Sequence, residues 1–106
     1  MKRYLVNAAS LNMIGGKNAR WEIRWISIEA ARSLARDAQN ALGHASTAAV
    51  VGAALYGAPL PAQRIDIQLE AGDELLVAQY QGPRLAEGTT ILPAGAQIAW
   101  ALVVVE

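Results

Sequence analysis

The single histidine of the chain, His44, lies in the run Gly43-His44-Ala45-Ser46-Thr47, directly before an alanine-rich stretch with a helical pattern. Histidine can donate or accept a proton at cellular pH, because its ordinary pKa lies close to neutrality. We expect Ser46 or Thr47 to cap the helix, so that the N–H groups of its first turn form a site for an anion. A proton donor beside a phosphate site suggests phosphodiester chemistry. The alternative is a common helix cap in which His44 lies on the surface or in the core.

A second group of polar side chains follows a short strand predicted at residues 4–8. Asn7, Ser10 and Asn12 are spaced so that amide and hydroxyl groups gather around one strand end or turn. Such groups can hold a ligand, and they are also common turn formers. Both interpretations stay open.

Length and composition predict a single small domain, residues 1–106. Hydrophobic residues make up 54% of the chain but Phe is absent, so the core must be built from small aliphatic side chains, three Trp and three Tyr. A second subunit would add stability to a chain of this size. Nine basic and nine acidic residues give zero net charge, so the chain has no excess of positive charge to bind the phosphate backbone of long DNA or RNA. A small anionic ligand bound at one place remains compatible with this balance.

Metal and membrane sites are not expected. The chain has no Cys and one His, which excludes disulfides and thiolate metal sites and nearly excludes ligation by histidine. We therefore expect neither a metal nor another cofactor. The longest apolar stretch, residues 45–61, is interrupted by Ser, Thr, Gly and Pro and is too short to span a bilayer. No signal peptide is predicted at the N-terminus, so we expect a cytoplasmic protein that does not bind membranes.

The elements expected around these residues alternate along the chain. After a turn at residues 15–18, residues 20–28 predict a strand with Trp21, Ile23 and Trp25 on one face. Ser27 precedes an amphipathic helix that should end at Gly43. A second helix, residues 46–56, is apolar nearly all round, so it should be buried centrally or in a subunit contact.

The C-terminal half predicts strands. Residues 64–70 alternate between apolar and polar side chains, residues 71–73 turn, and residues 75–80 return, which is the pattern of a β-hairpin. Residues 98–105 form a continuous apolar strand of the kind covered on both faces. The expected fold class is therefore α/β, a mixed and mostly β sheet flanked by helices.

Four segments in this order resemble the viral anti-CRISPR ring nucleases of archaeal viruses and their bacterial and phage relatives. The segments are Leu5-Val6-Asn7-Ala8-Ala9-Ser10-Leu11-Asn12-Met13, Gly43-His44-Ala45-Ser46-Thr47, Arg64-Ile65-Asp66-Ile67-Gln68-Leu69-Glu70 and Arg84-Leu85-Ala86-Glu87-Gly88. Members of that family are small two-fold homodimers that degrade cyclic tetra-adenylate, the messenger of type III CRISPR systems. The chain departs from the family at Ala45, where viral members carry an acidic residue, and at residues 89–97, where the family has a short helix.

The resemblance implies a role for each matching residue. His44 matches a general acid that protonates the departing 5' oxygen while the neighbouring ribose 2'-hydroxyl attacks phosphorus. Arg84 and Glu87 match residues that position or activate the scissile region. Further matches are implied to hold bases, ribose or phosphate: Asn7, Ser10, Asn12, Ser46, Thr47 and Arg64. The products would be linear di-adenylates ending in a 2',3'-cyclic phosphate.

Each assignment has a simpler alternative. Arg64 can be a solvated cation at the start of a strand, and Arg84 and Glu87 can be a surface ion pair. Trp21 and Trp25 are expected in the core or an interface and not as base-stacking platforms. The rival functions are a protein that sequesters the cyclic nucleotide without cutting it, and a structural or protein-binding dimer in which His44 only caps or packs.

Overall fold

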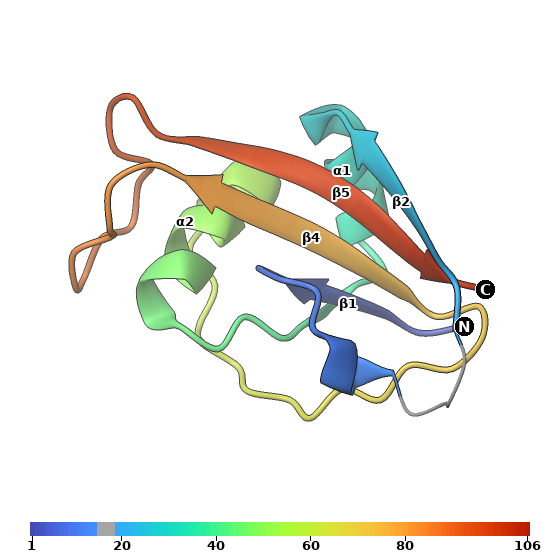
Figure 1. Cartoon of the computed structure of the whole chain (residues 1–106). Helices are drawn as coiled ribbons and strands as arrows, with labels where there is room; N and C mark the ends of the chain where they lie inside the picture. The colour runs from blue at the N-terminus through green and yellow to red at the C-terminus, as the bar shows by residue number, and fades with distance from the viewer. Residues whose placement is uncertain (15–18) are drawn as a thin grey trace.

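The computed structural model describes residues 1–14 and 19–106, and the turn predicted at residues 15–18 lies outside them. Five strands form one mixed sheet in the order β2-β5-β4-β1-β3 (Figure 1). The strands are β1 (Arg3–Val6), β2 (Trp21–Ile26), β3 (Gln39–Asn40), β4 (Glu74–Gln81) and β5 (Gln97–Val105). The helices are the 3-10 turn η1 (Leu11–Met13), α1 (Ile28–Ala35) and α2 (Ala45–Tyr56). This is the mixed α/β domain that the sequence predicts.

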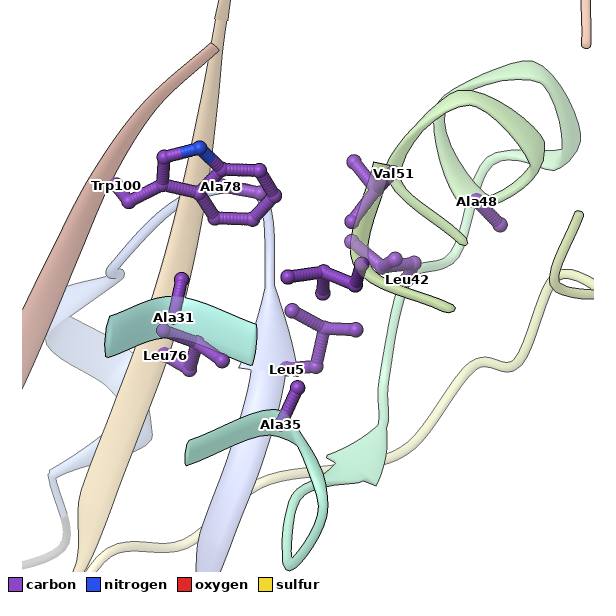
Figure 2. Packing of buried hydrophobic residues seen from close by; sticks show 10 residues of the cluster. Leu5, Ala31, Ala35, Leu42, Ala48, Val51, Leu76, Ala78 and Trp100 are labelled. Carbon is purple, nitrogen blue, oxygen red and sulfur yellow. The ribbon is translucent and has the colours of Figure 1, made fainter. Parts of the chain in front are cut away.

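The two α-helices cover one face of the sheet, and small side chains allow them to approach closely. Leu5, Leu76 and Trp100 project from neighbouring strands into a cluster that also contains residues of both helices (Figure 2). Ala31 of α1 and Ala48 of α2 are fully buried there. Alanine and leucine thus fill the space that Phe fills in other cores, as the composition requires.

The opposite face is covered by an extended segment and by Met13 of the short turn η1, and not by an α-helix. Ile67 and Leu69 are buried against Tyr4, Leu75 and Val103 of the sheet. This finding corrects the predicted hairpin between residues 64–70 and 75–80. β4 already pairs with β1 in parallel and with β5 antiparallel, so neither of its edges is open to residues 64–70. The alternating pattern arises because one side of this extended segment lies on the sheet.

The first α-helix is shorter than predicted. It ends at Ala35, and Gln39 and Asn40 form β3, which pairs in parallel with β1. The Asn40 side chain accepts from the N–H of Leu42 and donates to the carbonyl of Pro61, so it stabilises a turn immediately after the strand. The 3.6-residue spacing of alanine and leucine beyond Ala35 therefore reflects burial of a strand and a turn, and does not reflect a continued helix.

The start of β4 is fixed beside β1 by a buried carboxylate. Asp73 accepts from the backbone N–H groups of Lys2 and Glu70 at 2.9 Å each. Burial by itself raises the pKa of Asp73, but these two hydrogen bonds and the nearby positive charge of the N-terminus and Lys2 outweigh it and lower the pKa below its ordinary value. The carboxylate thus sets the alignment of β1 and β4, whose far ends carry the candidate site.

Candidate active site

A cleft of about 860 Å³ lies between the start of α2 and the loop that connects β4 to β5. Residues 82–96 form this loop, which contains turns and no helix and projects from one end of the sheet (Figure 1). The cleft is lined by His44, Ala45, Ser46, Thr47, Tyr80, Gly82, Arg84, Leu85, Ala86 and Glu87. Two segments that resemble the ring nucleases, residues 43–47 and 84–88, therefore meet in one cavity.

Strand direction explains why these segments meet. β1, β3 and β4 run parallel, so their carboxyl ends lie at the same edge of the sheet. The chain leaves β3 at Asn40 and reaches His44 four residues later, and it leaves β4 at Gln81 directly before the loop with Arg84. In open α/β sheets, ligands commonly bind beside the carboxyl ends of the strands.

The first turn of α2 presents backbone N–H groups to the cleft. His44 is the N-cap residue, and its imidazole makes no capping hydrogen bond. The predicted cap at Ser46 or Thr47 is wrong by two or three positions, because the helix begins at Ala45 and the carbonyl of His44 accepts the first helical bond, from Ala48. The N–H groups of Ala45, Ser46 and Thr47 precede that bond and can face an anion.

The cleft carries one cationic and one anionic side chain at its rim. Arg84 and Glu87 both line it and are exposed. Among the described residues, the ion pairs join Arg3 to Glu74 and Asp37, and Arg24 to Glu22. Arg84 and Glu87 are therefore not a surface ion pair, which leaves the guanidinium available to a phosphate.

Comparison with known proteins identifies the family. The family model described as STIV B116-like matches residues 3–95, and thus nearly the whole chain. This chain belongs to the STIV B116-like family. The solved structure of B116 of Sulfolobus turreted icosahedral virus (STIV) matches with a TM-score of 0.82 and 25% sequence identity, over 98% of this chain and 99% of that chain. None of the curated proteins matches.

The family match agrees with the viral part of the resemblance drawn from the four sequence segments. It extends across both segments that line the cleft and across the alternating segment at residues 64–70. Neither description states an activity. The chemistry of the site must therefore be argued from its own residues.

Four of the predicted ligand-binding residues of this STIV B116-like protein lie outside the cleft. Asn7, Ser10 and Asn12 are exposed beyond the carboxyl end of β1, where the Ser10 hydroxyl hydrogen-bonds the side-chain oxygen of Asn12. Arg64 is exposed and its Nε lies 3.5 Å from the carbonyl oxygen of Gly43, next to His44 in the chain. Asn7 directly follows β1 at the edge of the sheet that holds the cleft, whereas the carbonyl of Asn12 accepts from the Gln68 side chain in the extended segment on the opposite face.

Sequence reasoning missed several lining residues of the cleft, of which Tyr80 is the most informative. It lies near the end of β4, and its phenol hydroxyl donates to the carbonyl of Pro83 at 2.5 Å. The sequence offers one signal for it, a tyrosine shortly before the Gly82-Pro83 pair that leads into Arg84.

Neither a metal cluster nor a membrane helix occurs in the part of the chain that the structure describes. No three His, Cys, Asp or Glu side chains come together there in a group that could hold a metal ion. Within residues 1–14 and 19–106, no helix is both long and apolar enough to cross a bilayer.

Proposed function

We propose that this protein is a metal-independent ring nuclease that cleaves cyclic tetra-adenylate to linear di-adenylates with a 2',3'-cyclic phosphate and so switches off type III CRISPR signalling. The observation that carries the proposal is the common cleft of His44, Arg84 and the first turn of α2. These groups supply a proton donor, a phosphate-binding cation and backbone donors at one place. The resemblance of four sequence segments to the ring nucleases supports the choice of substrate class.

The proposed reaction needs little from the protein, because RNA contains its own nucleophile. The ribose 2'-hydroxyl releases its proton to water as its oxygen attacks the adjacent phosphorus, the bond from phosphorus to the 5' oxygen breaks, and His44 gives its proton to that leaving oxygen. Arg84 and the N–H groups at the start of α2 stabilise the charge on the pentacovalent phosphorus. Glu87 helps to position or activate the scissile region. No step requires a metal or another cofactor.

The proposal predicts cleavage in the presence of excess EDTA. Purified protein incubated with cyclic tetra-adenylate and EDTA should yield di-adenylates with a 2',3'-cyclic phosphate, resolved by chromatography and mass. Strict dependence on added manganese or magnesium would refute the mechanism. Tight binding of an intact ring would instead favour sequestration, and absence of both binding and cleavage would favour the structural alternative.

We also propose that the protein acts as a homodimer. Cyclic tetra-adenylate repeats the same nucleotide around a ring, so a two-fold dimer can address opposite phosphates with two copies of His44. The ligand would also extend beyond one cleft, toward Asn7 at the carboxyl end of β1 and toward further residues outside the cleft: Ser10, Asn12 and Arg64. Thr47 and the backbone N–H of Ser46 would bind phosphate from within the cleft, because the Ser46 hydroxyl already donates to the carbonyl of Ala86.

The buried second helix no longer supports a subunit contact, because the single chain already buries Ala48, Val51 and Leu55. The exposed apolar surface lies elsewhere. Ile23 and Trp25 of the edge strand β2 are 56% and 66% exposed. Trp25 is therefore not a core residue, and an interface is the remaining expectation for it.

Sedimentation equilibrium of the free protein should give twice the chain mass of 11.2 kDa. The measured mass should remain twice the chain mass on dilution to nanomolar concentration if the site requires both copies of His44. A monomer that still cleaves the ring would contradict the shared-site proposal. It would leave the chemistry proposed for a single cleft unaffected.

A further inference from the structure

The loop with Arg84 and Glu87 is attached to the body of the protein at two carbonyl groups. The first is the carbonyl of Pro83, which accepts from the Tyr80 hydroxyl at 2.5 Å. Tyr80 lies on β4 opposite Ile98 of β5, so its backbone is part of the sheet and not of the loop. One end of the loop is therefore held by a side chain whose own backbone is fixed by strand pairing.

The second attachment is the carbonyl of Ala86. It accepts from the Ser46 hydroxyl of α2 at 3.0 Å, from the Thr89 hydroxyl at 2.6 Å and from the Thr89 N–H at 3.1 Å. Arg84 lies between the two attached carbonyls. Its backbone is thus restrained on both sides, while its side chain extends freely at the rim of the cleft.

We propose that Tyr80 is a positioning residue of the cleft, whose hydroxyl fixes the turn at Pro83 and thereby aims Arg84 at the phosphate served by His44. The proposal rests on the proposed function, because it takes Arg84 to bind the scissile phosphate. It assigns the Tyr80 hydroxyl no contact with substrate. Gly82 makes the close approach possible: a Cβ built there would lie 3.0 Å from the Tyr80 hydroxyl oxygen and 2.7 Å from the Ala96 Cβ.

Such a bond matters for rate because displacing a catalytic group by about 1 Å can cost on the order of a hundredfold. An exposed turn after a Gly-Pro pair samples many orientations unless something holds it. Of these two attachments, loss of the Tyr80 hydroxyl leaves the one at Ala86. Arg84 would then reach the productive orientation in a smaller fraction of molecules.

The test compares Tyr80→Phe with Tyr56→Phe. The Tyr56 hydroxyl also donates to a backbone carbonyl, that of Ala35, at 2.8 Å, but it joins the ends of the two helices outside the cleft. Both variants lose one hydroxyl and one hydrogen bond to a carbonyl. Single-turnover cleavage of cyclic tetra-adenylate should be about tenfold slower in Tyr80→Phe, with less than a threefold change in Kd, and unchanged in Tyr56→Phe.

A double-mutant cycle separates positioning from a general structural effect. Because Tyr80 acts through Arg84, Tyr80→Phe should cause no further slowing in an Arg84→Ala background. Equal slowing in both backgrounds would overturn the proposal. So would a wild-type rate in Tyr80→Phe alone.

A third measurement needs no activity, since trypsin cleaves after Arg84. In native conditions Tyr80→Phe should raise the rate of cutting after Arg84 at least fivefold, and Tyr56→Phe should leave it unchanged. An unchanged tryptic rate in Tyr80→Phe would overturn the proposed role of Tyr80 even if the protein is an active ring nuclease. Inactivity of the unaltered protein toward all cyclic adenylates, with faster tryptic cutting in Tyr80→Phe, would instead refute the proposed function and leave Tyr80 as the residue that holds the loop.

Discussion

Replacement of His44 by alanine should slow cleavage of cyclic tetra-adenylate by about a hundredfold to ten-thousandfold, which is the usual contribution of a general acid. Binding should change little, because the imidazole serves one leaving oxygen while the ring is held by many groups. The substitution should not disturb α2, since the His44 side chain makes no capping hydrogen bond. The single-turnover rate and the Kd, measured on the same protein, check both parts.

His44→Asn provides the matched control for the helix. Asparagine is among the best N-cap residues, so this variant should start α2 at least as well as histidine does. It cannot donate a proton as an acid, so its cleavage rate should fall as far as that of His44→Ala. Recovery of activity in His44→Asn would show that the residue contributes through the helix start and not through its proton. An unchanged rate in both variants would remove the general-acid role.

The sequence predicts His44 and the helix after it better than it predicts the elements between the candidate site residues, whose roles stay predictions. His44 stands before a stretch with a helical pattern, and the structure confirms that α2 follows it directly; the helix ends at Tyr56, and Gly57 after it adopts a φ of 76°. The error concerns the cap: hydroxyl residues favour the N-cap position, but here both hydroxyls lie within the first turn. A pattern of residue types predicts that a helix is present more reliably than it predicts the residue at which the helix begins.

The hairpin error has a different cause. Alternation at residues 64–70 reports only that one side of an extended chain is buried, which Ile67 and Leu69 confirm. It does not report which strand, if any, lies beside that chain. The partners of β4 are instead β5, which follows it in the chain, and β1, from the other end of the sequence, and no local spacing reveals the pairing with β1. The cleft depends on that pairing, so its existence was not predictable from spacing alone.

Tyr80 illustrates the remaining gap between sequence and site. It lies at the end of the strand predicted at residues 75–80, and nothing in its neighbours predicts that its hydroxyl will reach the carbonyl of Pro83. That contact follows from the fold of the loop back toward the sheet. Arg84 and Glu87, by contrast, are site residues implied by the resemblance of residues 84–88 to a known family, and the structure adds that both line the cleft with His44.

Gly52→Ala should lower the free energy of unfolding by about 2–3 kcal/mol, even though alanine favours helices over glycine by about 1 kcal/mol. Gly52 is buried in α2, and the chain turns at Gly57 and returns along the helix. A Cβ on residue 52 would lie 2.5 Å from the backbone nitrogen of Leu60 and 2.7 Å from the carbonyl oxygen of Ala58. Backbone atoms cannot rotate away as a side chain can, so the returning segment must shift.

Thermal unfolding measures the effect, and a loss of about 2 kcal/mol corresponds to a decrease in Tm of roughly 10 °C for a domain of this size. Leu60→Ala separates the two sources of crowding, because the Leu60 Cγ would lie 2.8 Å from the added Cβ. If backbone contact dominates, Leu60→Ala should not rescue Gly52→Ala. A Gly52→Ala protein more stable than the original would show that helix propensity outweighs the contact, and that the segment after Gly57 does not press against α2 as the structure has it.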